Sequence, residues 1–137
     1  MTSTFTGPNR RQVLAGLAAV SFARPARAVP FALSAAPATA QLAPPEYAPT
    51  PVWAFNDATP GPLLRARQGD RMQVRVTNGL DQDTAVHWHG LRLENAMDGV
   101  PYLTQAPILP GESFDYDFRL PDAGTYWYHS HNRSFEQ

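Results

Sequence analysis

Strict alternation of apolar and polar residues is the feature that most constrains the fold of this 137-residue chain. In residues 113–120 the apolar positions are Phe114, Tyr116, Phe118 and Leu120, and the polar positions between them are Asp115, Asp117 and Arg119. Residues 71–77 alternate in the same way and end at the turn signal Asn78-Gly79. A period of two places one set of side chains on each face of a half-buried β-strand, so both segments are predicted to be strands.

Further short segments support an all-β fold. Strands are expected over residues 52–55, 63–67, 84–91 and 125–131, and no stretch after residue 28 keeps a helical period. Short strands separated by turns rich in Gly, Pro, Asn and Asp predict an antiparallel sandwich or small barrel. Residues 29–50 are rich in Ala, Pro and Thr. They are expected to form a flexible or polyproline-like lead-in, with at most one edge strand near its end, so that the folded domain spans residues 51–137.

Residues 1–28 predict an export leader. Arg10 and Arg11 precede an apolar stretch over residues 13–23, and a small-x-small triplet ends at Ala28. This order is typical of a twin-arginine signal peptide, which indicates a periplasmic or secreted bacterial protein. The stretch is shorter than the roughly 20 residues of a permanent membrane anchor. A cytosolic amphipathic helix is the alternative, and the lack of acidic residues in the leader disfavours it.

Charge and cysteine content exclude several classes of function. All 11 basic residues are arginine, against 12 acidic residues, and 0 residues are Cys. Cleavage after Ala28 removes four arginines, which leaves 11 − 4 = 7 basic residues, a net charge of −5. The mature chain therefore has no charge-based case for binding nucleic acid or membranes. Without cysteine it has no disulfide, no thiolate nucleophile and no sulfur ligand for a metal.

The histidines carry the chemistry. The chain contains 4 His, and they form two H-x-H pairs, His87/His89 in AVHWHGL and His129/His131 in TYWYHSH. Residues two apart on a strand point to the same face, so each pair is expected to present both imidazoles together. Neighbouring strands would bring all four into one metal site.

The spacing alone does not choose the metal. Neutral imidazole binds copper, zinc, iron and nickel. A mononuclear zinc or non-haem iron site on a β-barrel stays open, although such a site leaves the second H-x-H pair without a role. Four histidines without sulfur suit part of a multinuclear imidazole cluster.

Residues 87–131, HWHGLRLENAMDGVPYLTQAPILPGESFDYDFRLPDAGTYWYHSH, resemble the first cupredoxin (plastocyanin-like) domain of the multicopper oxidases. The resemblance extends back through TPGPLLRARQGDRMQVRVTN, residues 59–78, and covers the chain from about Val52 to its end. It implies a Greek-key β-barrel of a laccase-like oxidoreductase. In that family a copper cluster reduces dioxygen to water while a reducing substrate such as a phenol, Fe(II), Mn(II) or Cu(I) is oxidised.

The resemblance also implies residue roles. His87 would bind the type 2 copper, His89 and His129 one type 3 copper, and His131 the other, which makes half of a trinuclear cluster. Asp98 would be the acid beside the cluster that assists proton delivery to dioxygen, although an Asp-Gly turn is its structural alternative. The neighbouring aromatic residues are expected to pack the barrel around the site; they are Trp88, Tyr126, Trp127 and Tyr128. Arg65 and Arg67 are expected to face solvent or to form ion pairs rather than to be catalytic.

The chain departs from the family pattern in what it lacks. It has no Cys, no H-C-H motif and no H-x-x-H-x-H motif, so the type 1 copper site and the other half of the cluster are expected to belong to a missing C-terminal cupredoxin domain. It also ends at SFEQ, before the G-L-x-G-type strand that closes the barrel. We therefore expect a fragment, a truncated gene product or one piece of a split protein that does not turn over alone. The alternative is a free-standing periplasmic copper-binding module.

Overall fold

The computed structural model describes residues 26–133 and shows an all-β chain. The strands are β1 Ala28–Ala40, β2 Thr50–Phe55, β3 Arg71–Asn78, β4 Val86–His89, β5 Ser113–Arg119 and β6 Trp127–Ser130. The described residues add one 3₁₀ turn, Asn95–Met97, and no helix among them is long and apolar enough to cross a membrane. Most of the predicted leader, and the position of the expected closing strand, lie outside the described residues.

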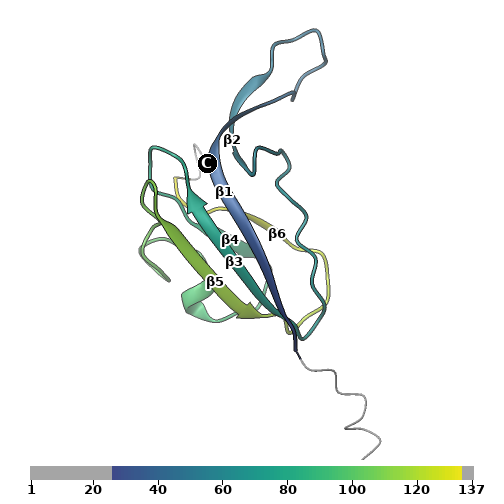
Figure 1. Cartoon of the computed structure of the whole chain (residues 1–137), viewed down its shortest axis with the longest axis vertical. Helices are drawn as coiled ribbons and strands as arrows, with labels where there is room; N and C mark the ends of the chain where they lie inside the picture. The colour runs from purple at the N-terminus through teal and green to yellow at the C-terminus, as the bar shows by residue number, and fades with distance from the viewer. Residues whose placement is uncertain (1–25, 134–137) are drawn as a thin grey trace, which may run out of the picture.

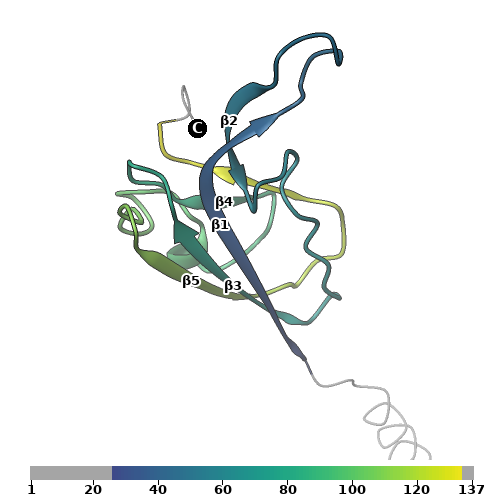
Figure 2. The same cartoon turned by 45° about the horizontal axis from the view of Figure 1, so that its top comes forward.

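Two sheets form the layers of a sandwich (Figures 1 and 2). The first has the order β2-β1-β3-β5 and the second pairs β4 with β6. All neighbours are antiparallel except β1 and β3, which are parallel. Because β1 lies between β2 and β3, the connection from β2 to β3 crosses from one side of β1 to the other. The predicted sandwich is confirmed, with one parallel pair that the sequence did not indicate.

The core fills the space between the sheets. From β5, Tyr116 and Phe118 are fully buried, and from β3, Val74 and Val76 are 1% and 0% exposed. Their polar neighbours along both strands face solvent, where Arg75 and Asp115 form an ion pair between β3 and β5. The period-two prediction for both segments is therefore confirmed, and burial of these apolar side chains is the main force that joins the layers.

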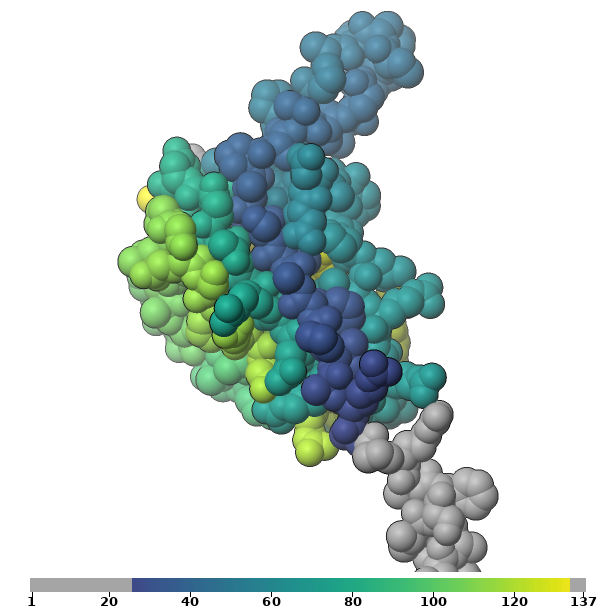
Figure 3. All heavy atoms as spheres, viewed as in Figure 1, coloured from purple at the N-terminus to yellow at the C-terminus, as the bar shows by residue number. Residues whose placement is uncertain are grey.

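The expected flexible lead-in over residues 29–50 is wrong for its first part. β1 lies inside the first sheet between β2 and β3, and its Leu33 is 2% exposed. Prolines are tolerated here because β3 pairs only with residues 28–35 of β1 and β2 only with residues 35–40. Pro30 and Pro37 therefore each have a neighbouring strand on one side only. Because this segment is rich in small residues, its sequence did not indicate a strand, although β1 crosses the visible face of the molecule (Figure 3).

The expected strand over residues 63–67 does not form. This segment follows Pro60-Gly61-Pro62 and pairs with no strand, and its Leu63 is 74% exposed. Arg65 and Arg67 are exposed, as expected. The expected strands at 84–91 and 125–131 form over shorter ranges, as β4 and β6; these two short strands carry three of the histidines, and His131 follows directly after β6.

Candidate metal centre

The pairing of β4 with β6 brings the two H-x-H motifs together. His87 lies directly opposite His129, and His89 lies opposite Trp127. His131 follows the end of β6, where its backbone N–H donates to the carbonyl of Ala85 at 3.3 Å. Because side chains two apart share a face, all four imidazoles lie on the same side of this two-stranded sheet. This confirms the expectation that the two H-x-H pairs lie side by side and on one face.

Trp88 holds β4 in the orientation that turns both of its histidines outward. Its side chain is 2% exposed, and its ring lies 5.3 Å from the ring of Tyr116 and 5.2 Å from that of Phe118. The Tyr116 hydroxyl also accepts a hydrogen bond of 3.0 Å from the N–H of Val86, and burial raises the pKa of Tyr116 to about 12. β5 thus fixes β4 by ring packing and by one buried hydrogen bond. Because side chains alternate along β4, His87 and His89 then lie on the face opposite Trp88.

A backbone carbonyl sets the tautomer of His87. Its Nδ1 donates to the carbonyl oxygen of Asp98 at 2.7 Å, and the Asp98 carboxylate lies 3.5 Å from the same nitrogen. A proton on Nδ1 leaves Nε2 with a free lone pair for a metal. The side chain of His87 is only 18% exposed, so its orientation is well constrained.

Gly99 makes this contact possible. It is buried with a φ of +80°, and a Cβ added there would overlap the carbonyl group of Val86 and lie 2.9 Å from Cα of His87. Only glycine combines this backbone conformation with such close approach to β4. The turn at Asp98 and Gly99 therefore places the carbonyl of Asp98 where it accepts the hydrogen bond from His87.

A ring nitrogen of His89 lies close to a ring nitrogen of His129. Nδ1 of His129 donates to the carbonyl oxygen of Ser130 at 2.7 Å, which leaves Nε2 as an acceptor, and Nδ1 of His89 donates a hydrogen bond of 3.4 Å to this Nε2. Two imidazole nitrogens bound to one metal at about 2.0–2.1 Å, with an angle of about 110–120°, are about 3.3–3.6 Å apart. The spacing therefore fits a metal ion shared by these two side chains.

Three of the four histidines form one candidate cluster. The ligand atoms of His87, His89 and His129 all lie within 4.8 Å of one another. His131 stands outside this group, although its ring centroid is 5.2 Å from that of His87. Burial lowers the pKa of His129, and the three other imidazoles add to that effect, so the neutral, ligating form is favoured. An all-nitrogen set without sulfur fits copper, and equally the other imidazole-binding metals.

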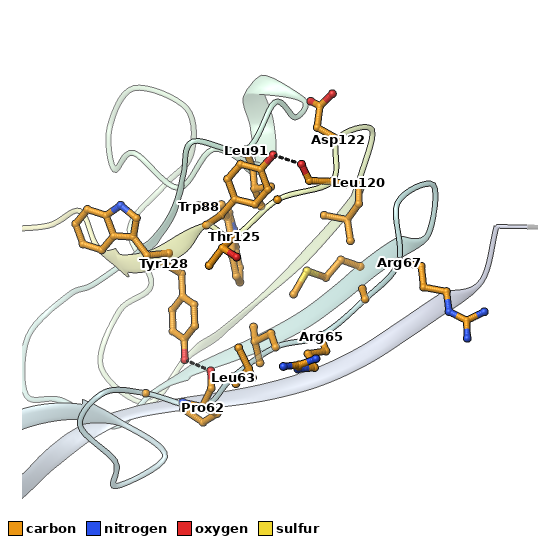
Figure 4. Close-up of a pocket in the computed structure, with 18 of the residues that line it drawn as sticks. Pro62, Leu63, Arg65, Arg67, Trp88, Leu91, Leu120, Asp122, Thr125 and Tyr128 are labelled. Carbon is orange, nitrogen blue, oxygen red and sulfur yellow. Dashed lines mark hydrogen bonds between the residues drawn. The ribbon is translucent and has the colours of Figure 1, made fainter.

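The opposite face of β4 and β6 borders a separate hollow of about 920 Å³ between β6 and residues 60–68 (Figure 4). None of the four histidines lines it. Tyr128 points toward this segment and donates from its hydroxyl to the carbonyl of Pro62 at 2.8 Å, while Arg67 points away. The hollow is not part of the histidine cluster, although Trp127 of the histidine face also lines it.

The expected packing role of the aromatic residues holds for Trp88 and Tyr128 but is wrong for Trp127. Trp127 is 57% exposed and lies on the histidine face, two residues before His129. Tyr126 is also partly exposed, at 38%. Alternation along β6 is the signal that could have placed Trp127 beside the histidines. No comparable signal marks the close approach of Gly99, which depends on a turn ten residues beyond β4.

Comparison with known proteins agrees with this geometry. The family model described as multicopper oxidase matches residues 38–137. The chain belongs to the multicopper oxidase family. Copper resistance protein A of Pseudomonas syringae pv. tomato is 51% identical over 84 residues, which are 61% of this chain and 14% of that protein. Laccase-1 of Cryptococcus neoformans var. neoformans is 52% identical over 83 residues, 58% of this chain and 13% of that protein.

A solved structure of a family member shows the same fold. The multi-copper oxidase from Pseudomonas thermotolerans matches with a TM-score of 0.74 and 48% identity, over 80% of this chain and 26% of that chain. The match confirms the predicted cupredoxin-like fold of this multicopper oxidase domain. The chain spans about one seventh of the length of the curated relatives, so what whole family members do is carried to it only as a proposal.

Proposed function

We propose that this chain is the N-terminal copper-binding domain, residues 51–137 with β1 added, of a laccase-like multicopper oxidase, and that it supplies half of a trinuclear copper cluster. The separation of 3.4 Å between Nδ1 of His89 and Nε2 of His129 is the observation that carries the proposal, because it matches two nitrogens on one metal. The names of the relatives, a copper resistance protein and a laccase, favour copper over zinc or iron.

The proposed roles are those that the resemblance to the family implies. His89 and His129 hold one type 3 copper, His87 the type 2 copper through its free Nε2, and His131 the other type 3 copper. When complete, such a cluster would pass electrons taken from the reducing substrate to dioxygen, which is reduced to water. The further histidines, the type 1 copper site and the contacts with the reducing substrate belong, in this proposal, to a C-terminal cupredoxin domain. Residues 1–28 act as a twin-arginine leader that exports the protein to the periplasm or beyond.

Asp98 is proposed to assist proton delivery to dioxygen beside the cluster. Its carboxylate is 3.5 Å from Nδ1 of His87, but the backbone carbonyl at 2.7 Å makes the positioning hydrogen bond. Asp98→Asn should therefore leave the copper affinity of this chain within about threefold, while it slows dioxygen reduction in a full-length parent enzyme. Metal titration of the chain and oxygen uptake by the parent measure the two effects. Loss of copper from the variant chain would show that the carboxylate is structural.

A competition titration tests the proposed copper site. The metal-free chain, equilibrated with equal Cu(II) and Zn(II), should retain copper, because imidazole ligands bind copper more tightly than zinc. Equal retention of both metals, or preference for zinc, contradicts the copper site and favours a mononuclear zinc or iron site. The DNA that follows the codon for Gln137 tests the oxidase context. An H-C-H motif downstream supports the two-part enzyme, and its absence in every frame favours a free-standing copper-binding module.

A further inference from the structure

Trp127 is an exposed aromatic side chain in direct contact with two of the candidate ligands. Its ring centroid lies 4.1 Å from that of His129 with an interplanar angle of 25°, and 4.8 Å from that of His89 with an angle of 29°. These distances and angles are those of stacked rings. Exposure of 57% means that this indole is not held in place by burial in the core.

The position of Trp127 follows from the register of β4 and β6. It lies directly opposite His89 across the two strands and two residues before His129 on the same face. One indole therefore contacts both rings whose nitrogens are 3.4 Å apart. His129 has a second restraint, the hydrogen bond from its Nδ1 to the carbonyl of Ser130, and the exposed His89 is held to His129 by the hydrogen bond between their rings.

We propose that Trp127 is the positioning residue of the His89/His129 pair: its indole stacks on both imidazoles and holds their ligand nitrogens at the separation that one metal ion needs. The inference rests on the proposed copper site, where it assigns a role to a residue that touches no metal. A single hydrogen bond between the two rings still allows the exposed imidazole of His89 to turn about its side-chain bonds, and stacking limits that rotation before the metal arrives. Trp127 thus lowers the entropic cost of metal binding.

Two variants separate stacking from bulk. Trp127→Leu removes the aromatic ring and keeps an apolar side chain, and Trp127→Phe restores a smaller ring. Trp127→Leu should weaken Cu(II) binding by about threefold to tenfold, as loss of aromatic pairs does, and Trp127→Phe should recover most of the affinity. The thermal midpoint of the metal-free Trp127→Leu chain should stay within about 2 °C of the parent, since the side chain is largely exposed.

A measurement without metal keeps this proposal distinct from the copper assignment. In the NMR spectrum of the metal-free chain, the ring protons of His89 and His129 should be displaced by the indole ring current, and Trp127→Leu should abolish that displacement while Trp127→Phe keeps part of it. Unchanged His89 and His129 signals in Trp127→Leu would overturn the proposal whether or not the chain binds copper. Equal copper affinity in the parent chain and in both variants would also overturn it. So would a Trp127→Leu chain whose metal-free thermal midpoint falls by well over about 2 °C, because its loss of affinity would then come from damage to the fold. Displaced ring signals in a chain that binds no copper would leave the stacking intact and reject the proposed function instead.

Discussion

Gly99→Ala is expected to destabilise the fold by about 3–5 kcal/mol, a loss in the range reserved for severe local disruption. The added Cβ meets the carbonyl group of Val86 and Cα of His87, both of them backbone of β4, which cannot rotate away as a side chain could. The left-handed φ of +80° adds about 1–2 kcal/mol of strain for any L-residue. Chemical denaturation of the metal-free chain, monitored by circular dichroism, measures the change.

The same substitution should weaken metal binding in whatever fraction still folds. Moving the turn away from β4 takes the Asp98 carbonyl from Nδ1 of His87, and loss of such an orienting contact costs about 10–100-fold in metal affinity. Gly111→Ala is the matched control, since Gly111 has a φ of +79° and no atom within 4 Å of the added Cβ. That variant should lose only the backbone strain, about 1–2 kcal/mol, with unchanged copper affinity. Similar losses in the two variants would show that the contact with β4 contributes nothing.

Removing a ligand from the central pair should have the second large effect. His129→Ala takes Nε2 away from the position 3.4 Å from Nδ1 of His89, so the loss of copper affinity should exceed the 10–100-fold expected for loss of an orienting contact. The imidazole is only half-buried and its removal opens no core cavity, so the metal-free stability should change by less than about 1 kcal/mol. Isothermal titration with Cu(II) measures the affinity, and thermal unfolding checks the fold.

Tyr128→Phe is the control for this experiment because it lies next to His129 on the opposite face of β6. It removes the hydrogen bond from the Tyr128 hydroxyl to the carbonyl of Pro62 but leaves the histidine face untouched. Its copper affinity should equal that of the parent chain, with a stability loss of about 1 kcal/mol. A Tyr128→Phe chain that loses as much copper as His129→Ala would place the metal elsewhere, and full retention of copper by His129→Ala would do the same.

The parts of this protein that depend on short-range pattern were predictable. Period-two alternation in residues 71–77 and 113–120 gave strands whose inward faces are buried, because alternation is a property of the strand itself. It also placed the members of each H-x-H pair on one face and Trp88 on the other. The low-complexity appearance of residues 28–40 concealed β1, since small residues and prolines fit a strand only where its neighbours are already in place.

The amino-acid sequence by itself determined the fold class, the identity of the four candidate ligands and the face that each occupies, because these follow from local periodicity and from imidazole chemistry. Only the tertiary structure decided that His129 lies opposite His87, that the Asp98 carbonyl, rather than its carboxylate, orients His87, and that Trp127 stacks on the ligands. It also showed why residue 99 is glycine. Each of these depends on the pairing of strands about 40 residues apart or on the close approach of two backbones, and no local pattern encodes such distances.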